Sequence, residues 1–145
     1  MKKSVLILIV FLSFLVMSCD TGVGAETGTE SGTIRIVSIT PEGPYTEGIS
    51  YNFTVQVAYT LENIDEAEIT VGFGTQESDG SSTTSIDSSE VVTLTTTEMT
   101  KTYTFSKTLY DATPDENILR TSLKPYPVSG SYTPYDSESL VVTVQ

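Results

Sequence analysis

The sequence predicts an all-β protein built as an antiparallel β-sandwich of about seven strands, and three observations carry that prediction. From Thr33 to Gln145, apolar side chains recur at every second position, which is typical of strands with one buried face. Short polar segments rich in Gly, Pro, Ser and Asp separate these runs and mark turns. The one cysteine, Cys19, lies outside this segment, so a hydrophobic core must hold the fold without an internal disulfide. We therefore expect a single domain over residues 33–145.

The first two predicted strands show the pattern most clearly. Ile34, Ile36 and Ile39 mark the first strand, and the alternation slips near Val37 and Ser38, which predicts an irregularity there. The second strand is predicted over residues 51–59, where large apolar side chains occupy one face. That face consists of Tyr51, Phe53, Val55, Val57 and Tyr59. Because the alternation is so regular, we expect this strand to be central in its sheet.

Five further strands are predicted downstream. Their inward positions are Ile69, Val71 and Phe73; Val92 and Leu94; Tyr103, Phe105 and Leu109; Leu119, Thr121 and Leu123; and Leu140, Val142 and Val144. The turn-rich segment 41–48 separates the first two strands. Residues 113–116, Thr-Pro-Asp-Glu, predict a short helical turn, because proline and acidic residues suit the first turn of a helix. The chain is expected to cross between the sheets at this point.

The start of the second strand resembles a known kind of module. The prolines and Gly48 that lead into Tyr51-Asn52-Phe53-Thr54-Val55 resemble the first turn and second strand of bacterial immunoglobulin-like modules, which include adhesion-type and fibronectin-III-like repeats. The chain departs from the antibody pattern, because it has neither tryptophan nor a cysteine pair to pin the sheets together. The resemblance implies a binding or spacer role, although fold alone does not decide function.

An export leader is predicted at the start of the chain. Lys2 and Lys3 precede an uncharged, mostly apolar run over residues 5–17. As a helix this run would span roughly 20 Å, less than the ~30 Å of a bilayer core, so we expect a cleaved signal. Val16-Met17-Ser18-Cys19 resembles the bacterial lipobox, with Met17 where a smaller residue is usual. The resemblance implies removal of residues 1–18 and attachment of acyl chains such as palmitate to Cys19.

Residues 19–32 are predicted to tether the domain to this lipid anchor. The segment is rich in Gly, Thr and Glu, and a flexible chain of this length reaches roughly 20 Å. Asp20 follows the cysteine, and in the enteric bacterial system an aspartate there is associated with retention at the inner membrane. We expect a lipid-anchored protein of the bacterial cell envelope, on the outer face of the inner membrane or at the outer membrane.

The charge of the chain restricts its partners. Without Lys2 and Lys3, five basic residues face nineteen acidic ones, a net charge of −14. Nucleic acid and anionic lipid surfaces attract basic proteins, so nucleic acid is excluded as a partner and membrane attachment must rest on the acyl chains.

The residue inventory argues against most enzyme chemistry. The chain has no histidine, which removes the commonest general base, the Ser-His-Asp triad and the usual zinc sites. It also has no glycine-rich phosphate loop and no Gly-x-Ser-x-Gly sequence. Paired carboxylates stay open, because glycoside hydrolysis needs only two acids at a suitable separation. We expect a non-enzyme with no catalytic residues, cofactor or metal site.

Segment 124–135, Lys-Pro-Tyr-Pro-Val-Ser-Gly-Ser-Tyr-Thr-Pro-Tyr, is a candidate ligand-binding loop. Tyr126, Tyr132 and Tyr135 combine rigid aromatic surface with neighbouring hydroxyl groups, a composition common in recognition loops. The alternative is that one or two of these rings fold back onto the core while the prolines stiffen the loop.

Two other features leave binding open. Carboxylates occur in segment 75–89 and in two later clusters, and they could supply oxygen ligands to calcium or could be solvated loop residues. These residues are Glu77, Asp79, Asp87 and nearby Glu90; Asp111, Asp115 and Glu116; and Asp136 and Glu138. Rows of threonine over 93–97 and 100–104 could meet polysaccharide or simply face solvent, as threonine does in many strands.

The leading hypothesis is a membrane-anchored lipoprotein that displays a non-catalytic, immunoglobulin-like binding or adhesion module. Its partner would be an envelope protein or a polysaccharide. The alternative is a structural accessory subunit of an envelope complex. A carboxylate-based glycoside hydrolase and a calcium-dependent carbohydrate-binding module are further alternatives.

Overall fold

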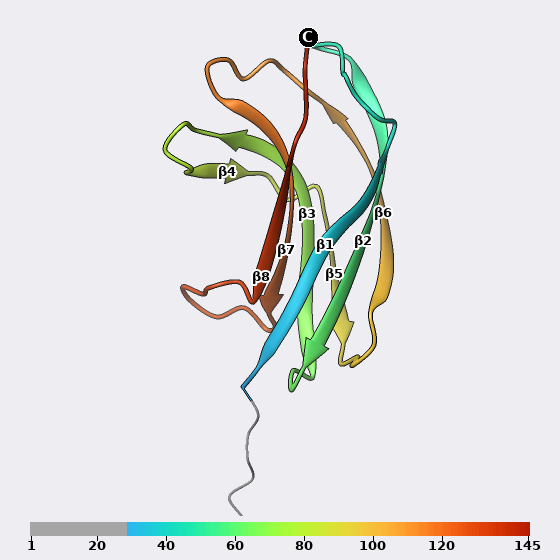
Figure 1. The fold of residues 1–145 in the computed structure, drawn as a ribbon, viewed down its shortest axis with the longest axis vertical. Helices are drawn as coiled ribbons and strands as arrows, with labels where there is room; N and C mark the ends of the chain where they lie inside the picture. Colours follow the sequence, from blue (N-terminus) through green and yellow to red (C-terminus); the bar gives the residue numbers. More distant parts are fainter. Residues whose placement is uncertain (1–28) are drawn as a thin grey trace, which may run out of the picture.

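The computed structural model describes residues 29–145, which form two facing antiparallel sheets (Figure 1). Eight strands make up this region, and the residues described contain no helix. The strands are β1 (Ser31–Thr40), β2 (Ser50–Glu62), β3 (Glu66–Gln76), β4 (Ser82–Thr84), β5 (Ser88–Thr93), β6 (Met99–Thr108), β7 (Glu116–Pro125) and β8 (Asp136–Val141). The predicted all-β, sandwich-like class is confirmed, with β4 in addition to the strands predicted.

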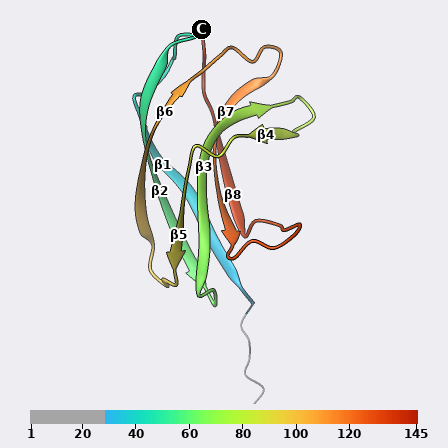
Figure 2. The same ribbon diagram turned by 180° about the vertical axis from the view of Figure 1, so that it is seen from behind.

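One sheet has three strands in the order β1-β2-β6, and the other has five. In the five-stranded sheet, β3 pairs with β7 on one side and with both β4 and β5 on the other, while β8 lies beyond β7 (Figure 2). Strand β4 lies in a segment predicted to be a loop, because its Ser-Thr-Thr sequence has no apolar alternation to predict a strand.

Two detailed predictions for the three-stranded sheet are confirmed. The register between β1 and β2 shifts between Ile36 and Ser38, where the sequence alternation slips. Strand β2 is central, paired with β1 on one side and β6 on the other. Its inward face buries Phe53, Val55, Val57 and Tyr59 as the period of two requires.

The core lies between the sheets and is centred on aromatic side chains. The rings of Phe53 and Phe73 meet across the two sheets with 4.6 Å between centroids. Tyr45, in the turn between β1 and β2, is also buried; its hydroxyl donates to the carbonyl of Pro41, and its ring contacts those of Tyr51 and Phe53. Two predicted inward residues, Leu94 and Leu140, are exposed near strand ends.

The predicted helical turn over 113–116 is wrong. The segment is a turn in which the Asp115 amide donates to the Ala112 carbonyl, and Asp111 Oδ1 accepts bonds from both the amide and hydroxyl of Thr113. This side-chain bond offers the backbone a partner outside a helix, as Asp often does. The chain nevertheless crosses between the sheets here, from β6 to β7, as predicted.

Polar contacts close both open sides of the sandwich. On one side, the Ile34 amide of β1 donates to Asp136 Oδ2 at 2.8 Å and the Ile36 amide donates to Glu138, so carboxylates of β8 occupy the free edge of β1. On the other side, Lys101 and Lys107 of β6 pair with Glu90 and Asp87. Within residues 29–145, no helix is long and apolar enough to cross a membrane.

Candidate binding groove

A groove of about 420 Å³ lies on the outer face of the five-stranded sheet. Its floor is made by outward residues of β3 and β7, which sit opposite each other in register: Thr70 opposite Ser122, and Gly72 opposite Arg120. The inward neighbours of these residues, such as Val71 and Leu123, belong to the core. Strand alternation therefore gives the groove a rigid floor backed by the core.

The first wall of the groove is the β4 segment, residues 82–86, and two glycines allow it to fold against β3. A Cβ at Gly72 would lie 1.7 Å from the Ser85 carbonyl oxygen, and one at Gly74 would lie 1.9 Å from that of Thr83. No other residue type fits so close an approach of two backbones. The sequence Val-Gly-Phe-Gly thus combines one inward aromatic side chain with two outward positions that leave room for a wall.

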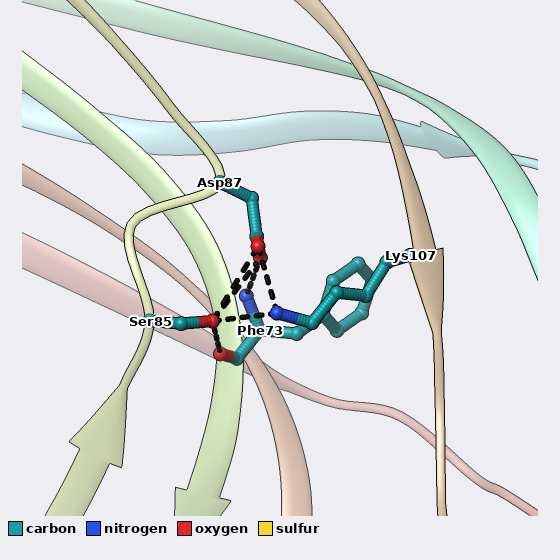
Figure 3. A network of polar contacts seen from close by, with 4 residues as sticks. All are labelled: Phe73, Ser85, Asp87 and Lys107. Carbon is teal, nitrogen blue, oxygen red and sulfur yellow. Dashed lines mark hydrogen bonds and ion pairs between the residues drawn. The ribbon is translucent and has the colours of Figure 1, made fainter.

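A polar network fixes the interruption between β4 and β5 (Figure 3). Asp87 Oδ2 accepts the Phe73 amide at 2.8 Å, and Asp87 Oδ1 pairs with Lys107 Nζ at 2.7 Å. Lys107 also donates to Ser85 Oγ, which in turn donates to the Phe73 carbonyl. The ion pair is largely shielded, since the Asp87 side chain is 12% exposed. One carboxylate therefore replaces a strand partner for Phe73 and ties the wall to the opposite sheet.

Two cationic side chains line the groove. Arg120 donates to Ser82 Oγ of β4 at 2.6 Å and to Ser137 Oγ of β8 at 3.2 Å, so its guanidinium is held across the sheet. Lys124 is 9% exposed, and its ammonium lies 5.5 Å from the centroid of the Tyr132 ring, a cation–π geometry. The sequence analysis did not single out Arg120, and it included Lys124 only as the first residue of the candidate loop 124–135. Their signal was the alternation of Arg120, Ser122 and Lys124 with inward Leu119, Thr121 and Leu123 along β7.

The three tyrosines predicted as one binding loop do not share one site: Tyr132 lines the groove, whereas Tyr126 and Tyr135 both line a second depression. Tyr132, 39% exposed, contributes with Pro134 to the second wall of the groove. Tyr126, 45% exposed, lines a different depression beside Pro125. Tyr135 packs against the core and its hydroxyl donates to Glu30; burial, and then this hydrogen bond, raise the pKa of that hydroxyl. Only Tyr132 joins the groove.

The acidic residues considered for calcium are distributed over separate roles. Asp79 accepts the Ser81 amide and Asp111 accepts from Thr113. Hydrogen bonding to the side chain, and then to the backbone, of Ser81 and of Thr113 lowers the pKa of the Asp79 and Asp111 carboxyl groups, respectively. Asp87 and Glu90 pair with lysines, and Asp136 bonds the edge of β1. Across residues 29–145, no group of three potential metal-ligating side chains converges on one point.

The predicted lipidation site, Cys19, and the predicted leader, residues 1–18, lie outside the described residues, as does most of the predicted tether. The end of the tether is described and contacts the domain: the Thr29 carbonyl accepts a bond from Asn63, and β1 begins at Ser31. The loop 126–135 lies at the same end of the domain as the start of β1, and the C-terminus lies at the other end (Figures 1 and 2).

Comparison with known proteins gives little further information. The sequence matches no protein-family model and no curated protein. Among solved structures, the chain is similar to Spo0M, a sporulation control protein from Bacillus subtilis, with 14% identity and a TM-score of 0.35. That match covers 81% of this chain and 50% of the other, so this chain spans about half the length of that structure.

Proposed function

We propose that this protein is a lipid-anchored, non-catalytic recognition module of the bacterial cell envelope, with an immunoglobulin-like domain that binds its ligand in the groove of the five-stranded sheet. The observation that carries the proposal is the groove itself, whose backbone walls, glycine floor and tethered arginine leave a rigid polar hollow on one face. Its volume of about 420 Å³ falls within the range of small-ligand sites, about 300–1,000 Å³.

The lining of the groove supports recognition of a polar ligand. Hydroxyl groups dominate it, contributed by Thr70, Ser82, Thr84, Ser85 and Ser122, with the Tyr132 ring at one side. Hydroxyl side chains can donate and accept hydrogen bonds, and an aromatic ring offers a flat apolar surface. A sugar has both kinds of surface, so a saccharide of the envelope fits this lining better than an apolar compound.

The proposed anchor affects which ligands the groove can reach. If Cys19 carries acyl chains, the tether holds the start of β1 within roughly 20 Å of the bilayer. The groove lies on the side of the domain rather than at its far end, so we infer a partner within the envelope rather than on another cell. This placement also keeps the accessory-subunit alternative open, with the same groove as the contact surface.

The groove gives a carboxylate-based hydrolase no support. Its lining includes no Asp or Glu within the described region. A second depression holds Glu30, Asp65 and Glu66, but all three residues are exposed, whereas a general acid in glycoside hydrolysis needs an apolar pocket.

Two variants test the proposed binding surface. Tyr132→Ala removes part of the groove wall, and Tyr126→Ala removes a similarly exposed ring that lines a different depression. On an array of envelope glycans, we expect wild type and Tyr126→Ala to bind the same glycans and Tyr132→Ala to lose binding at least tenfold. Equal binding by all three proteins, or no binding by wild type, would contradict the proposed site.

The anchor is tested separately by labelled palmitate incorporation. Wild-type protein expressed in a bacterial host should incorporate label and lose residues 1–18, and Cys19→Ala should do neither. Label on the Cys19→Ala protein, or none on wild type, would contradict the proposed anchor.

A further inference from the structure

The described residues contain five basic side chains, and their pairing separates them into two groups. Arg35 pairs with Glu98, Lys101 with Glu90 and Lys107 with Asp87. The remaining two, Arg120 and Lys124, both line the groove. Within residues 29–145, no carboxylate oxygen lies within 4.0 Å of either cation. In a chain with nineteen acidic residues, the two described cations without an acidic partner therefore line the same hollow.

Burial makes this arrangement chemically informative. Lys124 is nine-tenths buried, but its Nζ is not one of the buried polar atoms that lack a partner, so the ammonium itself is open to the groove. A cation in so confined a place is stabilised by a counter-charge or hydrogen bonds. The structure gives the Lys124 ammonium the Tyr132 ring and no hydrogen-bond acceptor in the described part of the chain. Three buried polar atoms of residues 29–145 lack a partner, and two belong to groove residues: Thr84 Oγ1 and Arg120 Nε. Unsatisfied polar groups thus concentrate around the same hollow.

The acidic residue opposite Lys124 in the sheet does not neutralise its charge. Glu68 of β3 is opposite Lys124 of β7 in register and so shares its face of the sheet. It nevertheless makes no ion pair with Lys124, and it does not line the groove. The floor of the groove is left with positive charge, hydroxyl groups and backbone.

We propose that the groove binds an oxyanion carried by a polyhydroxylated compound, that is, an acidic saccharide. Lys124 and the tethered guanidinium of Arg120 supply the charge for a carboxylate or phosphate group, and the hydroxyl groups of the walls bind the sugar hydroxyls. The inference rests on the proposed function and specifies its ligand class. The domain as a whole is strongly acidic and therefore repels anions from most of its surface. Binding of an anionic ligand is therefore expected only at this groove.

The experiment compares matched charged and neutral probes. Full-length protein in neutral detergent is titrated calorimetrically with trigalacturonate against its methyl ester, and with glucose 6-phosphate against glucose. These two pairs distinguish a carboxylate source from a phosphate source. Lys124→Met removes the charge and keeps an unbranched apolar stem, while Lys101→Gln removes one positive charge at the sheet edge as a matched control. Thermal unfolding establishes that each variant is folded.

The proposal predicts that at least one charged probe binds about tenfold or more tightly than its neutral partner, and that Lys124→Met abolishes this preference. Lys101→Gln should retain it. Arg120→Lys keeps the charge but loses the paired N–H donors of the guanidinium, so it should weaken the preference for the charged probe by a smaller factor than Lys124→Met does. Equal binding of charged and neutral probes would overturn the acidic ligand while leaving a saccharide groove intact. A charge preference unchanged in folded Lys124→Met would overturn the site assignment.

Discussion

The outer faces of the two sheets are built from similar residues but differ in what they leave unpaired. On the three-stranded sheet, short polar side chains satisfy one another: Thr33 and Thr60 share a 2.7 Å hydrogen bond, and Ser106 donates to Asn52. Its arginine, Arg35, pairs with Glu98. On the five-stranded sheet, Arg120 and Lys124 lack acidic partners beneath a backbone wall. A hydroxyl-rich strand surface thus becomes a candidate site where a hollow and an uncompensated charge coincide.

The largest effect is expected when the wall itself is disturbed. Gly72→Ala places a methyl group 1.7 Å from the Ser85 carbonyl, so the β4 segment must move, and we expect a loss of about 3 kcal/mol or more in the free energy of unfolding. Gly80→Ala has open space but a φ of +86°, and should cost about 1 kcal/mol. Urea unfolding measures both. A loss at Gly72 no greater than at Gly80 would mean that the wall does not depend on close backbone approach.

A second test compares the shielded ion pair that joins the two sheets with the exposed pair on the three-stranded sheet. Asp87→Asn removes the negative charge of the shielded pair with Lys107 and weakens the acceptor for the Phe73 amide. We therefore expect a loss of about 2 kcal/mol in the free energy of unfolding. Glu98→Gln breaks the solvent-exposed pair with Arg35 and should leave stability unchanged, because exposed pairs contribute little. Urea unfolding of the two variants under matched salt conditions checks the contrast. Similar losses would remove the distinction between the shielded and the exposed pair.

A third test concerns the buried polar atom without a partner that lies in the core and not in the groove. The Tyr103 hydroxyl is buried without a partner in the described region, so Tyr103→Phe should raise stability by about 1 kcal/mol. Burial, then the charge of Glu90, raises the pKa of Tyr103 above the value of about 10 expected for an unfolded chain.

The raised pKa of Tyr103 gives the same variant a pH signature. The folded protein retains a proton that the unfolded chain loses, so this residue's contribution to stability is full below pH 10 or so and is lost as the pH rises further. Wild type should therefore lose more stability between pH 8 and pH 11 than Tyr103→Phe. Identical pH profiles for the two proteins would show that this hydroxyl is not buried in the folded state.

The smallest effect is expected on the face of the three-stranded sheet. Thr102 lies on the outer side of β6 opposite Gln56, away from the groove. Thr102→Val should change stability by less than about 0.5 kcal/mol and leave ligand affinity unchanged. Glycan binding and urea unfolding are the measurements. A loss of glycan binding by Thr102→Val would indicate that the ligand binds the threonine-rich face of β6 and not the groove.

Period-two patterning predicted much of the fold, because core contacts decide which face of each strand is buried. It predicted the β2 face, the irregularity after Ile36 and the crossing between β6 and β7. It missed β4, whose pairing depends on Gly74 rather than on apolar residues. It also missed the burial of Tyr45, since a ring in a turn belongs to no alternating pattern. Pro114 and the acidic residues after it indicated a helical turn, but hydrogen bonds from Thr113 to Asp111 stabilise a non-helical turn instead.

The candidate site was much less predictable than the fold. The tyrosines of segment 124–135 were grouped by sequence proximity, yet the structure places Tyr132 in the groove and both Tyr126 and Tyr135 in a second depression. The groove joins β7 to the β4 segment, which lies about 40 residues earlier in the chain, so its lining depends on sheet order. Lys124 could be noticed in the sequence, but its lack of an acidic partner could be established only in three dimensions.

The most direct test of the account is a map of ligand contacts by amide chemical-shift changes during titration with trigalacturonate. If the groove is the binding site, we expect shifts concentrated at Gly72, Ser85, Ser122 and Tyr132, with none at Thr100 and Thr102 beyond the noise. Shifts concentrated on the threonine-rich face of β6, with the groove amides unchanged, would contradict it.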